Sequence, residues 1–175
     1  MLLASVAGAE GLSVQRAEGR HMGSNYLLSA DFDISFNYVV EQALTRGVTL
    51  HFISEFSLRR PRWYWFDEAL IQSEQMTKLS YNALTRQYRI GRGALFQNFS
   101  SLEDALRALG HQTSSALPTA LLDADSGYVA SVRLRLDVNQ LPKPLQVNTL
   151  TSKEWNLDSD VYTWIVRPNG KAGGQ

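Results

Sequence analysis

Strict alternation of apolar and polar residues constrains the fold of this chain more than any other feature. In the segment YVASVRLRLDV (128–138), every even-numbered residue is apolar, whereas Ser131, Arg133, Arg135 and Asp137 are polar. Successive side chains of a β-strand point to opposite faces, so this segment has one face for a core and one for solvent. Segments 26–35 and 48–58 repeat the pattern. Such half-buried strands are typical of an antiparallel sheet.

Shorter patterns raise the expected number of strands to about seven or eight. These shorter strand patterns lie at residues 12–16, 77–82, 87–90 and in the late segment VYTWIVR. Residues 82–86 are expected to join the second and third of these strands into a hairpin, and Pro168 is expected to end the last strand. This number predicts a mainly β, antiparallel β-sandwich-like fold, either immunoglobulin-like or a half-open barrel.

Two short helices interrupt the strands, and each is short enough to plug an end of the sheets. Apolar residues recur at helical spacing over 36–44, and Gly47 can end this helix in a left-handed conformation. For the second helix, Ser100 and Glu103 predict a capping box, and Gly110 follows its apolar stripe. Residues 91–93 (GRG) predict a turn or bulge, and residues 111–126 predict a long loop.

The length of 175 residues predicts a single β-rich domain over 10–168, followed by a disordered tail over 169–175. At the start, Ala7, Gly8 and Ala9 resemble the end of a signal peptide that would be cleaved before Glu10. Residues 1–9 are therefore interpreted as a truncated signal peptide, with a frayed chain end as the alternative, and the protein is expected to be periplasmic or otherwise exported. No transmembrane segment is predicted, because no stretch approaches the ~18 to 20 apolar residues that cross a bilayer.

The amino-acid composition excludes or disfavours several classes of function and site. The chain has 17 basic and 17 acidic residues, so binding to nucleic acid is not expected. It has no cysteine, which excludes disulfides and thiol nucleophiles. The histidines His21, His51 and His111 have no metal-binding spacing, and His51 is predicted to be solvated on the wet face of its strand. We predict no catalytic residue, no cofactor site and no metal site.

The segment RRPRWYWF (59–66) is the most prominent candidate surface. On an extended chain, Arg59 shares one side with two tryptophans, and Arg60 and Arg62 share the other side with Tyr64 and Phe66. A partner-binding surface is one interpretation. The other is that the arginines cover aromatic rings at a corner of the sandwich and pair with Asp67 and Glu68. The candidate partner-binding residues, with two arginines expected to adjoin across the later hairpin, are Arg60, Arg62, Trp63, Tyr64, Trp65, Arg86 and Arg89.

Two further functions stay open on the sequence alone. A glycan-active hydrolase would use Asp31, Asp33 or Asp67 beside the aromatic residues, although alternation already explains Asp31 and Asp33 as the wet face of a strand. Asp67 and Glu68 are adjacent, so on a strand they point to opposite faces. A purely structural subunit would instead bury the aromatic residues and pair its outer strand edges in an oligomer.

Four stretches of the chain occur in an order that resembles a known family. LSADFDIS, RRPRWYWFDE, LSYNALTRQYRI and SVRLRLDVNQLPKPLQV are similar to a proteobacterial domain-of-unknown-function family, number 4390, over about Tyr26 to Arg167. The residues that match its pattern include 60–67, Tyr81, Asn82, Arg86 and Arg89. Residues 111–126 and the clipped start depart from typical members.

The resemblance implies a signal peptide and a periplasmic protein, and it brings no catalytic residues. The family's genes often neighbour those of a sensor kinase of the nitrogen-regulation type, which implies an accessory role beside such a kinase. From the residues and the resemblance together, the leading hypothesis is an exported, non-catalytic domain that binds a protein of the cell envelope.

Overall fold

The computed structural model describes residues 11–62 and 68–169 and consists mainly of antiparallel strands. The elements in chain order are β1 (Gly11–Met22), β2 (Asn25–Ser35), α1 (Tyr38–Thr45), β3 (Leu50–Arg60), β4 (Glu68–Asn82), β5 (Gln87–Arg92), β6 (Leu95–Phe99), α2 (Leu102–Gly110), β7 (His111–Thr113), β8 (Leu117–Pro118), η1 (Thr119–Leu121), β9 (Tyr128–Leu136), η2 (Val138–Gln140), α3 (Lys143–Thr149), η3 (Lys153–Trp155) and β10 (Tyr162–Val166).

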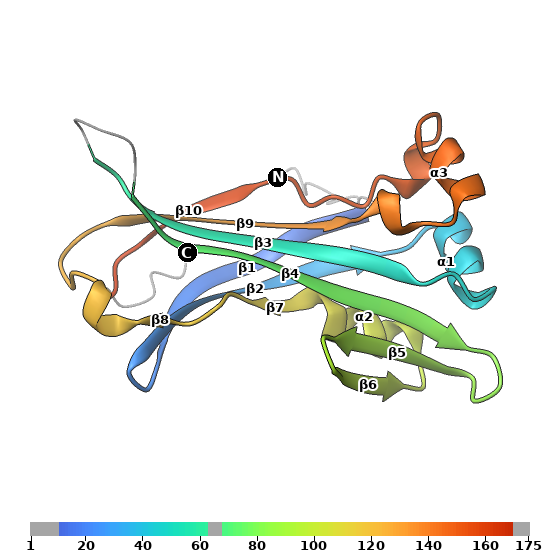
Figure 1. Cartoon of the computed structure of the whole chain (residues 1–175), viewed down its shortest axis with the longest axis horizontal. Coiled ribbons are helices and arrows are strands. Elements are labelled where there is room, and N and C mark those ends of the chain that lie inside the picture. The colour runs from blue at the N-terminus through green and yellow to red at the C-terminus, as the bar shows by residue number, and fades with distance from the viewer. Residues whose placement is uncertain (1–10, 63–67, 170–175) are drawn as a thin grey trace, which may run out of the picture.

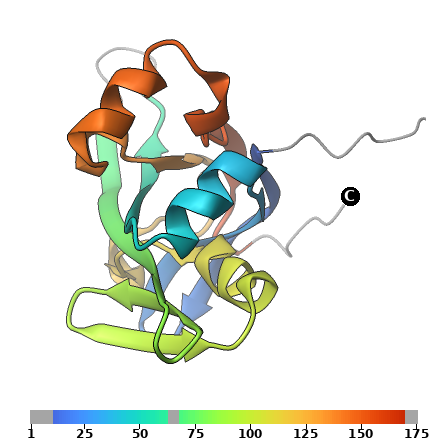
Figure 2. The same ribbon diagram turned by 90° about the vertical axis from the view of Figure 1, so that its right-hand side faces the viewer.

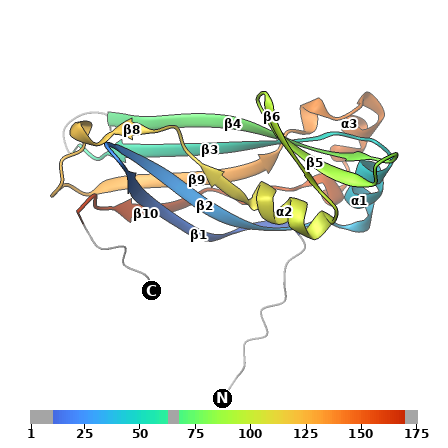
Figure 3. The same cartoon turned by 90° about the horizontal axis from the view of Figure 1, so that it is seen from below.

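The strands form two sheets that do not close into a barrel. The smaller sheet has the order β1-β2-β7, with β8 also paired to β2, and the larger has the order β10-β9-β3-β4-β5-β6. Figures 1 and 3 show them as two layers, with β3 and β4 running along the length of the molecule. β1 contacts β10 and β9, so the layers meet along that side. The predicted β-sandwich-like architecture is confirmed.

The core lies between the sheets, and alternation places its residues. On β9, alternate side chains from Tyr128 to Leu136 are at most 5% exposed, and the residues between them are half-buried. β2 also buries the even-numbered side chains from Tyr26 to Ile34, but Leu27 and Ser29 between them are buried as well, so its alternation begins only at Ala30. Each large apolar side chain that leaves water contributes about 1.5 to 3 kcal/mol, so this pattern decides which face of each strand points inward.

Helix α1 crosses one open end of the sandwich, as Figure 2 shows. Asn37 begins it by accepting a hydrogen bond from the N–H of Val40. Gly47 ends it with φ of 99° and donates to the carbonyl of Leu44. Val48 donates to Ala43, which completes a Schellman motif. The left-handed glycine predicted from the sequence is confirmed.

Helix α2 begins one residue later than expected. Its N-cap is Ser101, whose hydroxyl accepts from the N–H of Asp104 and donates to the Asp104 carboxylate. The predicted capping box of Ser100 and Glu103 is therefore wrong by one residue, because Ser101 and Asp104 have the same three-residue spacing and equivalent chemistry. Gly110 is the last residue of α2 and lies against the backbone of β2.

The long loop predicted over 111–126 is wrong in part. Its first residues form β7 and β8, both of which pair with β2, and η1 follows them. These strands of three and two residues are too short to show a period, so only pairing with β2 creates them. The expected turn at 91–93 is confirmed by Gly93, which has φ of 57° between β5 and β6.

Strand β6 and helix α3 were not anticipated. β6 exposes nearly all of its side chains, so it has no alternation of buried and exposed positions. α3 has seven residues and starts beside two prolines, and it buries none of its side chains. Neither element carries the periodic signal on which sequence prediction depends. Both lie toward the same end of the molecule as α1 (Figure 1).

Candidate functional site

The end of the β3–β4 hairpin gathers several arginines. We call Arg59, Arg60, Arg62 and Glu68 the arginine tip, in which Arg60 and Glu68 are cross-strand partners. Glu68 Oε2 lies 2.5 Å from Arg62 Nη2 and 3.6 Å from Arg60 Nη1. The pairing with Glu68, which the packing interpretation of this segment predicted, is confirmed for Arg60 and Arg62. Trp63, Tyr64, Trp65 and Asp67 lie outside the described residues.

Arg60 is also held from the interior. Its Nη2 donates to Tyr128 Oη at 3.1 Å, and its guanidinium carbon lies 5.5 Å from the centroid of that ring. Tyr128 is fully buried, and its hydroxyl also accepts from the N–H of Asp123 at 2.7 Å. The hydrogen bond to Tyr128 raises the pKa of Arg60 above its ordinary value. The buried Tyr128 therefore orients the guanidinium group of Arg60 at the surface.

The arginine tip carries more positive than negative charge. Among the described residues it contains three arginines and one carboxylate, that of Glu68, which lies within ion-pair distance of Arg60 and Arg62. Arg59 is exposed, and no carboxylate of the described residues lies within ion-pair distance of it. The side chains of Arg60 and Arg62 are 34% and 38% exposed, so an incoming ligand can reach them. The tip can thus offer guanidinium donors to an acidic partner.

Arg86 and Arg89 lie at the other end of β4. The β4–β5 turn contains Arg86, which is exposed with φ of 54°, whereas Arg60 pairs at the first residue of β4. A strand of 15 residues spans about 50 Å at ~3.3 Å per residue. The expectation that these arginines adjoin the tip is wrong, because β4 continues well beyond the predicted 77–82 segment. Figure 1 shows the two ends of β4 far apart.

Arg89 belongs instead to the β5–β6 hairpin. Its guanidinium carbon lies 4.5 Å from the centroid of the Phe96 ring, and its Nε donates to Asn98 Oδ1 at 3.2 Å. Both partners are on β6, which pairs with β5. Arg89 thus covers an exposed aromatic ring, as a cation stacked on a ring does elsewhere in proteins.

Asp31 and Asp33 lie on the wet face of β2, as alternation predicted. Asp31 Oδ1 is 2.7 Å from Nδ1 of His111, its cross-strand neighbour on β7. An Asp–His pair with this contact occurs in Ser-His-Asp sites. Throughout 11–62 and 68–169, however, no serine or threonine hydroxyl is hydrogen-bonded to His111. In the described part of the chain, the pair serves to join β2 and β7.

A cleft of about 510 Å³ between α2 and the smaller sheet contains two carboxylates, Asp33 and Glu103. Its apolar lining includes Phe32 and Leu106. Glu103 is 84% exposed and forms an ion pair with Arg107 at 3.1 Å. A glycosidase needs one carboxyl group kept protonated by a desolvating environment, and neither carboxylate of this cleft is buried.

The histidines are dispersed over the fold. His21 Nε2 lies 2.9 Å from the carbonyl of Pro168. His51 is half-buried, and burial together with the nearby Lys78 charge lowers the pKa of His51. The expectation of a solvated His51 is therefore wrong in part. Among the described residues, no cluster of three or more histidine and acidic side chains could hold a metal ion.

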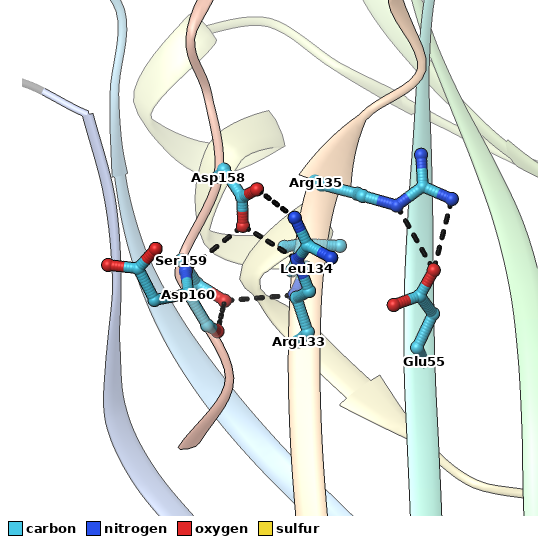
Figure 4. Close-up of polar contacts among 7 residues, drawn as sticks. All are labelled: Glu55, Arg133, Leu134, Arg135, Asp158, Ser159 and Asp160. Atoms are coloured by element: carbon cyan, nitrogen blue, oxygen red, sulfur yellow. Dashed lines mark hydrogen bonds and ion pairs between the residues drawn. The ribbon is translucent and has the colours of Figure 1, made fainter.

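The outer face of the larger sheet carries an ion-pair network that sequence reasoning did not single out. Arg133 donates to both carboxylate oxygens of Asp158, through Nε at 2.9 Å and through Nη2 (Figure 4). Arg135 Nε donates to Glu55 Oε1 at 3.0 Å. The network ties the segment before β10 to β9, and β9 to β3. The polar alternation of β9 was visible in the sequence, but Asp158 lies outside any periodic segment.

Asp158 is expected to contribute to stability at neutral pH. The hydrogen bonds from Arg133 lower the pKa of Asp158 below its ordinary value of 3.8. A lowered pKa in the folded state stabilises the fold above about pH 4, and this contribution is lost as the pH falls through the folded-state value. Asp158→Asn should lower the free energy of unfolding by about 1 to 2 kcal/mol at pH 7, and by less below pH 4. Urea titrations at both pH values measure the difference.

Asp160→Asn is the matched control, because Asp160 is exposed in the same segment and forms no ion pair among the described residues. Asparagine also tolerates the left-handed conformation found there, with φ of 57°. Its effect should stay within about 0.5 kcal/mol. Equal effects of the two substitutions at pH 7 would contradict the role given to Asp158.

Comparison with known proteins identifies the family. Within the described residues, no helix is both long enough and apolar enough to span a bilayer. No curated protein and no solved structure gives a significant match to the chain. The family model of the domain of unknown function DUF4390 matches residues 9–165, which is most of the chain. The chain therefore belongs to the DUF4390 family.

Proposed function

We propose that this protein is an exported, non-catalytic binding domain of the cell envelope, and that an acidic partner protein meets the arginine tip. The observation that carries the proposal is the arrangement of Arg60, which the buried Tyr128 holds in place while Arg59 beside it has no carboxylate partner among the described residues. A cation fixed before binding loses little conformational entropy when a ligand arrives.

A protein fits the tip better than a nucleic acid. The formal net charge of the chain is zero, so the positive excess is confined to a small area. Arginine, tryptophan and tyrosine are the residues most enriched among those that dominate protein–protein binding energy. Trp63, Tyr64 and Trp65 follow Arg62 directly in the sequence. Guanidinium groups also bind carboxylates through paired hydrogen bonds, which favours an acidic partner segment.

The proposed compartment rests on the Ala7, Gly8 and Ala9 pattern and on the family resemblance. We propose the exported part of a sensor kinase as the partner, since the resemblance implies that association. Cell fractionation and N-terminal sequencing of the native protein test export. A protein that remains in the cytoplasm with residues 1–9 attached would contradict this part of the proposal.

Charge reversal at the tip is expected to abolish partner binding. The full-length protein would carry a photo-crosslinking residue at position 72, an exposed site in the first third of β4 on the side of the arginine tip, and crosslinks to envelope proteins would be quantified with and without Arg59→Glu. We expect partner recovery to fall at least about tenfold, because opposite charges at an interface become like charges. Recovery of the wild-type protein should also fall as the salt concentration rises.

Arg86→Glu is the control, since Arg86 is an equally exposed arginine at the opposite end of β4. It should leave partner recovery unchanged, and thermal melting would verify that both variants fold. If folded Arg59→Glu retains the wild-type partner, or if Arg86→Glu is the variant that loses it, the arginine tip is not the binding site.

A further inference from the structure

The edge of strand β6 carries unused hydrogen-bonding groups. β6 pairs with β5 through a two-residue turn at Gly93 and Ala94, and no other described strand pairs with its far side. Because hydrogen-bonded and non-hydrogen-bonded pairs alternate from such a turn, the N–H and C=O groups of Phe96 and Asn98 point away from β5. The side chains of Leu95 and Phe96 are also 79% and 59% exposed.

The other strand edges of the described chain carry charges, a bulge or a neighbouring strand, or are very short, and residues 68–76 of β4, which have no partner on the β5 side, include Glu68 and Glu74. β1 carries Arg16, Glu18 and Arg20 and has a bulge between Val14 and Arg16. β10 lies beside β1, and β7 and β8 are very short. Charges, bulges, shortness and coverage are the usual means by which proteins prevent edge pairing. The β6 sequence LFQNF has no charged residue and no proline. This contrast indicates that β6 is kept open for a strand.

We propose that β6 pairs antiparallel with β6 of a second copy of this chain, about a two-fold axis at Gln97. In this register Phe96 and Asn98 of opposite copies exchange backbone hydrogen bonds, which uses the outward groups of both strands. Leu95 of each copy lies opposite Phe99 of the other, an apolar cross-strand pair. The larger sheets of the two copies become one continuous sheet. The interface is isologous, as in most homodimers.

A second copy fits this edge better than a different protein. The strand is complementary to itself in this register, because its apolar ends meet and its central glutamine faces a glutamine. Strand β6 itself has no charged residue that would select an acidic or basic partner, and Arg89 of β5 already stacks on Phe96 and donates to Asn98. The formal net charge of zero removes long-range repulsion between copies. The arginine tip lies at the far end of β4, so the two proposals fail or succeed independently.

A single cysteine tests the axis, since the chain has none of its own. In the proposed register Gln97 faces Gln97 of the other copy in a non-hydrogen-bonded pair, with Cα atoms about 4.5 to 5.5 Å apart, a separation that a disulfide spans. The full-length Gln97→Cys variant should form a covalent dimer under mild oxidation at least about tenfold faster than Leu84→Cys. Leu84 is the control because it is 96% exposed in the β4–β5 turn, off the axis.

Phe96→Lys is expected to dissociate the dimer. It places an ammonium group on the edge of each copy, and we expect dimerisation to weaken by about 100-fold or more, with Leu84→Lys close to wild type. Light scattering on the full-length protein at about 100 µM measures the mass, and thermal melting verifies folding. A monomeric wild type, or crosslinking of Gln97→Cys no faster than that of Leu84→Cys, would overturn the proposal. A dimer that survives in folded Phe96→Lys would also overturn it.

Discussion

Replacing Gly110 with alanine is expected to destabilise the fold by about 3 kcal/mol. A Cβ atom at this position would lie 2.4 Å from the carbonyl oxygen of Phe32, which is a backbone atom of β2. Neither side can move freely, because α2 packs on β2 and the next residue, His111, is already in the β2–β7 ladder. The methyl group therefore has to push the helix end and the strand apart. Urea unfolding monitored by circular dichroism measures the loss.

Gly127→Ala controls for the general cost of replacing glycine. A Cβ at Gly127 meets no atom within 4 Å, and its φ is not in the left-handed region. Alanine there should change the free energy of unfolding by less than about 0.5 kcal/mol, or raise it slightly by restricting the unfolded chain. If Gly110→Ala is as stable as Gly127→Ala, the close approach of α2 to β2 is wrong.

Gly19→Ala is expected to cost about 2 kcal/mol, because Gly19 also lies in close contact with a residue of β2. The Tyr26 ring lies over Gly19, so a Cβ there would lie 2.1 Å from Tyr26 Oη and 2.7 Å from its Cζ. Tyr26 is 2% exposed and stands edge-on to His21, with ring centroids 5.0 Å apart. Its burial raises the pKa of Tyr26 to about 12. The ring is confined and can yield only by disturbing its neighbours.

A double-mutant cycle separates this contact from an intrinsic effect of alanine in β1. Tyr26→Leu removes the ring, so Gly19→Ala should cost less than about 1 kcal/mol in that background. Thermal or urea unfolding of the four proteins supplies the cycle. Additive effects would show that Tyr26 does not limit the side chain at position 19.

The elements predicted best are those whose local chemistry and burial agree. β9 and the second half of β2 were expected because polar and apolar residues alternate along them, and burial of one face selects a strand's register. Helix α1 was expected because Gly47 supplies the left-handed residue at its C-terminal end. In each case, the residues that determine the element lie within the element or directly beside it in the sequence.

The elements that were missed depend on partners far away in the sequence. β7 and β8 exist because β2 supplies their hydrogen bonds. β4 extends toward Glu68 because β3, from Leu50 to Arg60, pairs with it. A strand made by its partner has no local signature. The Ser101 cap was misplaced for a different reason, since two adjacent serines offered the same cap and only the packing of α2 decided between them.

The same division holds for the candidate site. Adjacent arginines in RRPR were visible in the sequence, and so was a nearby glutamate for them to pair with. The contact between Arg60 and Tyr128 joins residues that are 68 positions apart, so no local sequence pattern predicts it. Arg89 looked like part of the same surface, but the length of β4 carries it to the far end of the sheet.

The sequence by itself determined the β-rich class, the inward faces of the long strands and the family, because alternation and motif are local properties of the chain. Only the tertiary structure decided that the arginines fall at two ends of β4 and that β6 remains an open edge. Both outcomes depend on strand lengths and neighbours, and these follow from pairing between distant segments. Such pairing is set by the free energy of the whole fold and by no single stretch of it.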